Sequence, residues 1–214
     1  MRVPFSPYLS SARGGLRRLV RRLSQEYPYA SLLATDSTGR RYEARRGQEA
    51  VQDSRWNERG CVARVHDGTG FREASFNGSL PAEEVLRLLA GSSPGGPGMQ
   101  YPVPPDPPLR RRWRSRVRVH PQAAGAERIL ERLTRLRDRA FAQSGLLADM
   151  RLVFEEVTVR KLFLSAHREL EQAYLWSQGS LVPVVRRGEE TRYVHEALSG
   201  LKGAELLDEM EGRL

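Results

Sequence analysis

Residues 59–71 read RGCVARVHDGTGF and hold the clearest structural signal in the chain. Apolar and polar side chains alternate in part from Gly60 to His66, and a second extended run follows from Gly70 to Ser75. Asp67-Gly68, between the two runs, is a dipeptide that tight β-hairpin turns favour. This stretch therefore predicts an antiparallel hairpin, and the rest of the first half is best interpreted around it.

A helix and two strands are predicted before this hairpin. Apolar residues recur at helical spacing from Leu16 to Leu23, with arginines on the other face. We expect strands at Tyr29–Thr35 and Arg40–Arg46, with a turn at Asp36–Gly39, because glycine near the end of a turn adopts positive φ at low cost. After the hairpin, Ser79 is the expected N-cap of a further helix.

The second half repeats this order. The predicted elements are a helix from about Gly125 to Gln143, strands at Met150–Val157, Arg160–His167, Ser180–Arg186 and Thr191–His195, and a short helix at Ala204–Glu211. Short matches between the halves recur at offsets of 119 to 122 residues, as between Gly39-Arg40 and Val159-Arg160. We therefore expect an α+β fold of two similar helix–hairpin–hairpin–helix units, each with an antiparallel sheet covered on one face by helices. Because many α+β chains divide into similar pieces, chance similarity is the alternative.

A Pro/Gly-rich segment separates the halves. Residues 91–108 read GSSPGGPGMQYPVPPDPP and hold seven of the 13 prolines. The expected organisation is a first unit at 1–90, a connector at 91–112 and a second unit at 113–214, which together make one domain or two. Composition does not separate a linker from a surface loop here.

Composition narrows the class of protein. The chain has 214 residues, a net charge of +9 and 39% hydrophobic residues, too many for a disordered chain. No apolar run approaches the roughly 18 residues of a membrane span, and no apolar segment of a secretory signal follows Arg2. The single cysteine, Cys61, excludes an internal disulfide and a cysteine-cluster metal site. We expect a cytoplasmic protein with no membrane partner.

No complete metal-binding motif is present. His195-Glu196 begins like the HExxH segment in which two histidines bind zinc and the glutamate acts as base. Ser199 and Gly200 stand where a second histidine is needed, so we interpret His195 as a strand-end residue. The remaining histidines share no ligand spacing: His66, His120 and His167.

No nucleophile or acid–base pair stands out either. Cys61 has no predicted base beside it and is interpreted as a small buried side chain. The GxSxG, P-loop and GxGxxG motifs are absent from the sequence. Asp149, Glu155 and Glu156 lie near a predicted strand, but nothing in their spacing pairs two carboxylates for catalysis.

Arginine clusters suggest an alternative function. They occur at Arg17–Arg22, Arg40–Arg46 and Arg110–Arg118, and Trp56 and Trp113 are available for base stacking. A nucleic-acid-binding module is therefore the alternative reading. It is less favoured, because no helix-turn-helix, RNP-type or zinc-finger pattern accompanies the charge.

Residues 59–71 also resemble a known family. They are similar to the RGxGxRVxxDGxxGFA segment in the N-terminal half of TldD/PmbA proteins, which are named as modulators of DNA gyrase and known as metallopeptidases. Arg112 to Pro121 resembles the start of that family's second repeat, and Leu162–Ser165 resembles one of its strands. The turn after Phe163 lacks the usual glycine, and the hairpin is one residue short.

The resemblance implies a role without catalysis on this chain. The family's zinc site, an HExxxH helix plus a later cysteine, belongs to a C-terminal domain, so its catalytic residues match no position here. No cofactor is expected on this chain, and zinc is expected on a partner or a missing domain. The implied function is an accessory domain or subunit that pairs with a catalytic TldD/PmbA-like subunit, as a heterodimer, and shapes the access of unfolded peptide to the zinc.

Four residues are candidate contacts to such a peptide or partner: Arg64, Arg72, Trp56 and Phe71. Arginines near the hairpin suit acidic peptides or partner carboxylates, and exposed strand edges suit strand addition. A self-contained hydrolase that uses His195, Glu196 or Cys61 is a third hypothesis.

Overall fold

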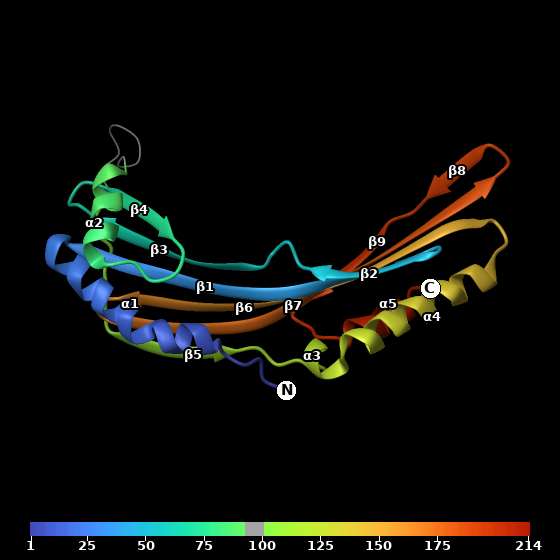
Figure 1. Cartoon of the computed structure of the whole chain (residues 1–214), viewed down its shortest axis with the longest axis horizontal. Coiled ribbons are helices and arrows are strands. Elements are labelled where there is room, and N and C mark those ends of the chain that lie inside the picture. The colour runs from blue at the N-terminus through green and yellow to red at the C-terminus, as the bar shows by residue number, and fades with distance from the viewer. Residues whose placement is uncertain (93–100) are drawn as a thin grey trace.

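A computed structural model provides the structure of the protein and describes residues 1–92 and 101–214 (Figure 1). The elements in chain order are α1 Pro7–Glu26, β1 Tyr29–Arg45, β2 Gln48–Asp53, β3 Glu58–His66, β4 Phe71–Phe76, α2 Ala82–Gly91, β5 Leu109–Arg114, α3 Pro121–Ala124, α4 Ala126–Gln143, β6 Leu147–Ser165, β7 Arg168–Arg187, β8 Glu190–Tyr193, β9 Glu196–Gly200 and α5 Leu206–Glu211.

One sheet runs through the described part of the chain. Its nine strands follow the order β4-β3-β1-β6-β7-β5, with β2 beside β1 and with β8 and β9 beside β7. All pairs are antiparallel except β5 with β7, which is parallel. An α+β fold with a large antiparallel sheet is therefore confirmed. Two separate sheets are not found, because β1 and β6 pair directly, and the two-unit arrangement is not confirmed.

The predicted breaks in the long strands are wrong. β1 continues through the expected turn at Asp36–Gly39, and β6 continues through Thr158 and Val159. Both strands are paired on both sides along most of their length, and this long-range pairing overrides the local turn signal. The backbone of Gly39 is extended. Glycine allows β1 to approach β6 closely here, because a Cβ at this position would overlap the backbone carbonyl of Glu156.

The β3–β4 hairpin is confirmed, and its turn is built on Asp67. The Oδ1 atom of Asp67 accepts hydrogen bonds from the amides of Thr69 and Gly70, each at 3.0 Å, and Gly68 adopts a φ of 103°. These hydrogen bonds, together with one from Arg72 Nε to Oδ2 at 2.9 Å, hold the pKa of Asp67 below its ordinary range.

The helices follow the predicted order, with corrections at α1, α2 and α3. α4 and α5 lie close to their predicted ranges, whereas α1 begins at Pro7, well before Leu16, and the short helix α3 was not predicted. The expected N-cap at Ser79 is wrong, because α2 begins at Ala82 and its N-cap is Pro81, which offers no side-chain hydrogen bond.

The helices cover one face of the sheet and create two hydrophobic cores, and a smaller third cluster on the same face consists of Val3, Val117, Ala173 and Leu175. Figure 1 shows α1 at one end and α4 and α5 at the other, along the same side of the long strands. Along β1, alternate residues face this layer: Ala30, Leu32 and Ala34 enter the first core with α1 and α2, and Tyr42 and Ala44 enter the second with α4 and α5.

A polar belt separates the two cores on the same face. It consists of Asp36, Thr38 and Arg40 on β1 and Glu156, Thr158 and Arg160 on β6, which pair across the two strands. Arg160 donates to the carbonyl of Pro4 and to Thr38 Oγ1, at 3.2 and 3.0 Å. The belt lies where the helical layer passes from α1 to α4.

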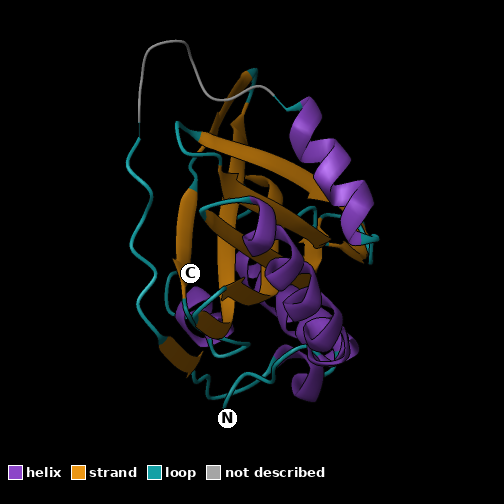
Figure 2. Cartoon of the chain, turned by 90° about the vertical axis from the view of Figure 1, so that its left-hand side faces the viewer, coloured by secondary structure: helices purple, strands orange, loops and turns teal. Residues whose placement is uncertain are grey.

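The chain from Tyr101 to Pro108 forms a surface loop along the outside of the molecule before it enters β5 (Figure 2). The carbonyl of Tyr101 contacts His66 Nε2 at 2.8 Å, and Asp106 accepts a hydrogen bond from Ser165 Oγ at 2.6 Å. Residues 93–100 of the expected connector lie outside the described residues. The boundaries proposed near residues 90 and 113 remain a prediction.

None of the helices in residues 1–92 and 101–214 has the length and apolar character that a membrane span requires.

Candidate functional site

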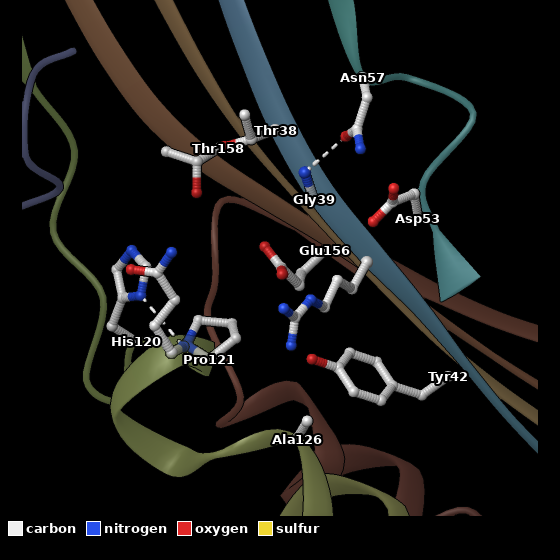
Figure 3. Close-up of a pocket in the computed structure, with 12 residues that line it drawn as sticks. Thr38, Gly39, Tyr42, Asp53, Asn57, His120, Pro121, Ala126, Glu156 and Thr158 are labelled. Atoms are coloured by element: carbon white, nitrogen blue, oxygen red, sulfur yellow. Dashed lines mark hydrogen bonds between the residues drawn. The ribbon is translucent and has the colours of Figure 1, made fainter. Parts of the chain in front are cut away.

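A polar cavity of about 430 Å³ opens at the belt between the two cores (Figure 3). It lies on the helix-covered face, where β1 and β6 pass from one core to the other. Its walls come from three segments far apart in sequence, and they are formed by Thr38, Gly39, Arg40, Tyr42, Asp53, Asn57, His120, Pro121, Gln122, Ala126, Glu156 and Thr158.

Strand pairing places two carboxylates on either side of one arginine in this cavity. Arg40 on β1 lies opposite Asp53 on β2 and opposite Glu156 on β6. The Arg40 side chain hydrogen-bonds Tyr42, and among the described residues its guanidinium forms no ion pair within 4 Å. Glu156 is only 6% exposed, and burial raises its pKa to about 7. A hydrogen bond from the Arg40 amide and the charges of Arg40 and Arg160 oppose this rise.

His120 closes one side of the cavity. It is the N-cap of α3, and its Nδ1 atom accepts a hydrogen bond from the amide of Gln122 at 3.3 Å. The residue is 5% exposed, and its Nε2 atom is buried without a partner. Burial, helped by the Arg160 charge, lowers the pKa of His120, so the ring is neutral at pH 7.

Tyr42 and the start of α4 form another part of the wall (Figure 3). Burial raises the pKa of the Tyr42 hydroxyl, the Glu156 carboxylate adds to the rise, and Arg40 opposes it. Gly125 is the N-cap of α4 and makes no side-chain cap hydrogen bond. The first amides of α4 therefore bring a partial positive charge to this side of the cavity.

The walls of the cavity are polar and mixed in charge. The cavity combines the Arg40 guanidinium, two carboxylates and several hydroxyl and amide groups, which suit a small polar molecule. In the described ranges no three histidine, cysteine, aspartate or glutamate side chains come together to hold a metal ion. The zinc that the family resemblance places on a partner or a missing domain remains a prediction.

The opposite face of the sheet carries partly exposed apolar side chains, and no helix of residues 1–92 and 101–214 packs on it. The buried residues of α1, α2, α4 and α5 all belong to the two cores on the other face. We call this surface the open face and define it by its half-buried residues: Leu33, Val62, Val159, Phe163, Leu170, Tyr174 and Trp176.

Glu155, adjacent to Glu156, points to the open face. Its carboxylate accepts hydrogen bonds from Ser54 Oγ and Gln178 Nε2, each at 2.7 Å. The sequence indicated no catalytic pairing of these acids, and strand geometry indeed places their side chains on opposite faces of the sheet.

Three of the four predicted contact residues come together at the β3–β4 hairpin. Arg64 pairs with Glu73 and lies over the Phe71 ring, 5.2 Å from its centre. Arg72 is held within the chain, since it donates to Asp67 and to the carbonyl of Ser92.

Phe71 also packs edge-on against His66, with ring centres 5.0 Å apart. Trp56 lies apart from this group in the loop between β2 and β3 and is 58% exposed. The contact roles of all four residues remain predictions.

Two buried glutamates on β7 gather many of the arginines that suggested nucleic-acid binding. Glu171 pairs with Arg13 at 2.5 Å, Arg112 at 3.1 Å and Arg114 at 2.6 Å. Glu169 contacts Arg13 at 3.0 Å and also pairs with Arg17. These pairs neutralise part of the positive charge inside the molecule and weaken the case for a phosphate-binding surface.

The residues considered for a self-contained hydrolase do not form a site. Cys61 is 3% exposed, and burial raises its pKa to about 11, so the reactive thiolate is disfavoured. Glu196 begins β9 and pairs with Arg213 at 3.4 Å.

Nothing in the sequence brought Arg40, Tyr42, His120 and Glu156 together as one site. A usable signal was the change from apolar to polar residues at alternate positions of β1, from Leu32 and Ala34 to Asp36 and Arg40. That change marks a gap in the apolar contact with the helical layer.

Comparison with known proteins identifies solved structures with a similar fold. The chain is similar to a Bacteroides thetaiotaomicron protein named as a modulator of DNA gyrase, with a TM-score of 0.65 and 13% identity over 97% of this chain and 50% of that one. It is also similar to TldE from Thermococcus kodakarensis, with a TM-score of 0.62 and 14% identity over 93% and 46% of the two chains.

A Thermotoga maritima protein, also named as a modulator of DNA gyrase, gives a TM-score of 0.62 and 10% identity over 96% and 46%. No protein-family model matches the sequence, and no curated protein is significantly similar to it. The chain spans about half the length of the structures it matches.

The fold is thus α+β, with a single curved sheet that carries helices on one face and, among the described residues, no helix on the other. This is the fold found in TldE and in the proteins named as modulators of DNA gyrase, so the resemblance noted in residues 59–71 is confirmed at the level of the fold.

Proposed function

We propose that the chain is a non-catalytic part of a TldD/PmbA-like metallopeptidase, which pairs through its open face with a zinc-bearing chain or domain and shapes the access of unfolded peptide. The fold match over about half of each related structure supports a part of a larger assembly. The observation that carries the proposal is the open face, where Phe163, Tyr174 and Trp176 are partly exposed on a sheet that no described helix covers.

Physical reasoning favours a protein partner for this face. The open face exposes apolar side chains over several strands, with Thr35, Lys161 and Gln172 among them. Exposed apolar groups mixed with polar ones are typical of interaction sites. Aromatic side chains supply much of the binding energy at such sites. Trp113 extends the surface onto β5, since its ring lies 6.2 Å from the ring of Tyr174.

The test is purification of the tagged full chain from the native cell extract, at moderate salt and with nuclease present. We expect recovery of a larger protein with an HExxxH segment and metal-dependent peptidase activity. Trp176→Glu and Phe163→Glu, made separately, are expected to lose that protein. Leu88→Glu is the matched control, because Leu88 is 44% exposed on α2, away from the open face.

Thermal unfolding curves establish that each variant is folded. Loss of the catalytic chain from Leu88→Glu as well, or its retention by both open-face variants, would contradict the proposed surface. Recovery of nucleic acid alone, with affinity that falls steeply with salt, would favour the arginine-based alternative.

A further inference from the structure

The cavity at the polar belt contains opposite charges that form no ion pair within 4 Å among the described residues. The Arg40 side chain hydrogen-bonds Tyr42, and its charge acts on Glu156 without a close contact. Glu156 is buried, and Asp53 lies opposite Arg40 on β2. A ligand that carries both charges would satisfy these groups together, whereas a simple anion would face two carboxylates and a simple cation would face the arginine.

We propose that this cavity binds a small zwitterion that carries a primary amine and a carboxylate, either a free α-amino acid or a dipeptide. The site lies on the helix-covered face, away from the open face, so the inference is independent of the proposed function.

The carboxylate of the ligand would lie beside Arg40, Tyr42 and the first turn of α4. Figure 3 shows Tyr42 and Ala126 on one side of the cavity, with the Tyr42 hydroxyl turned inward. Arginine binds carboxylates through two parallel hydrogen bonds, and a helix N-terminus adds amide donors. Gly125, the N-cap of α4, leaves these amides without a side-chain partner.

The amine of the ligand would lie beside Glu156. Figure 3 shows the Glu156 carboxylate between Tyr42 on one side and Thr158 on the other, with Asp53 across β1. An ammonium group donates three hydrogen bonds, and the Glu156 carboxylate and the Thr158 hydroxyl are acceptors on this wall.

His120 provides an independent indication that the cavity has a polar occupant. Its side chain lines the cavity, yet its Nε2 atom is buried and has no hydrogen-bond partner. Such an atom is costly to leave unsatisfied, and a polar ligand supplies a partner for it. The volume of about 430 Å³ lies toward the small end of ligand sites and is ample for an amino acid or a dipeptide.

The test is a titration of the full chain with alanine and with alanylalanine, monitored through the amide NMR signals of Arg40 and Ala126 and the ring signals of His120. We expect saturable shifts at millimolar concentration or below. Acetylation of the amine or amidation of the carboxylate of either compound is expected to weaken binding about 10-fold or more. Tighter binding of alanine identifies a free amino acid as the ligand class, and tighter binding of alanylalanine identifies a peptide.

Two variants assign the two ends of the ligand. Glu156→Gln is expected to weaken alanylalanine about 10-fold and to leave N-acetylated alanylalanine unchanged. Arg40→Gln is expected to weaken alanylalanine to the same extent and to leave its C-terminal amide unchanged. Arg192→Gln is the control, because Arg192 is exposed on β8 and outside the cavity. An absence of saturable shifts up to about 10 mM, or equal binding of blocked and unblocked compounds, overturns the proposal.

Discussion

At the scale of single residues, Glu156 is the group whose ionisation the fold opposes. Its pKa is about 7 in the folded chain, against an ordinary value of 4.5, chiefly because it is buried. Between pH 4.5 and pH 7, the Glu156 carboxyl keeps its proton in the folded chain and releases it in the unfolded chain. The stability that comes from the neutral carboxyl is therefore complete below pH 4.5 and is lost as the pH rises through 7.

This linkage predicts the effect of Glu156→Gln. The amide stays neutral at every pH, so the variant should match the natural chain near pH 5 and exceed its stability at pH 8 by roughly 1–3 kcal/mol. Urea unfolding at the two pH values measures the difference. Glu190→Gln, at an exposed position on β8, serves as the control. Equal stability of Glu156→Gln and the natural chain at pH 8 would show that Glu156 ionises without cost.

Gly39 gives a second prediction at this scale. Its backbone packs so closely on β6 that a Cβ would overlap the Glu156 carbonyl, and a neighbouring backbone cannot move aside as a flexible side chain can. Gly39→Ala should therefore separate β1 from β6 locally and lower the free energy of unfolding by about 3 kcal/mol. Gly145→Ala is the control, because a Cβ at Gly145 meets no atom within 4 Å. An unchanged denaturation midpoint for Gly39→Ala is the contrary result.

At the scale of elements, ion pairs join α1 and β5 to β7. Glu171 is 4% exposed, and although burial alone would raise its pKa, the Arg114 hydrogen bond and the Arg13 and Arg112 charges hold that pKa below its ordinary value. The pairing therefore stabilises the fold above pH 4.5 and stops doing so as the pH falls through the lowered pKa.

Glu171→Gln tests this connection. The substitution leaves Arg13, Arg112 and Arg114 without their shared carboxylate, and we expect a loss of about 3 kcal/mol at pH 7. The loss should shrink as the pH falls through the lowered pKa of the natural carboxyl, because its charge is then lost as well. Chemical denaturation at pH 7 and pH 3 measures both values. Glu73→Gln, which breaks the more exposed pair with Arg64, should cost less than about 1 kcal/mol at either pH.

The same scale shows what the sequence can predict. The β3–β4 hairpin and α4 carry local signals, the Asp67-Gly68 turn and a helical apolar period, so their positions were predictable. The apparent turn before Arg40 was misleading, because strand pairing on both sides of β1 outweighs a local preference. The cavity could not be located from the sequence, since it joins Arg40, His120 and Glu156, which only long-range pairing and the position of α3 bring together.

At the scale of the whole molecule, the long strands make the two cores dependent on each other. β1 contributes Leu32 to one core and Tyr42 to the other, and β6 contributes Leu162 and Phe154 in the same way. β1 and β6 pair over fourteen positions, from Ser31 with Ser165 to Ala44 with Leu152. A chain built in this way should unfold as one unit even though its apolar residues form separate clusters.

Division of the chain between its halves tests this dependence. A fragment of residues 1–92 keeps β1 but loses β6, and a fragment of residues 113–214 keeps β6 but loses β1, so each would expose one edge of a strand that is central in the intact sheet. By circular dichroism, we expect that neither fragment on its own unfolds cooperatively and that their equimolar mixture recovers a cooperative transition.

In the intact chain, Leu32→Ala and Leu133→Ala, one in each core, should each lower the free energy of unfolding by about 2–5 kcal/mol and shift a single shared transition. Independent cooperative melting of the two fragments, or two separate transitions in either variant, would instead establish two autonomous units with a boundary in the Pro/Gly-rich segment.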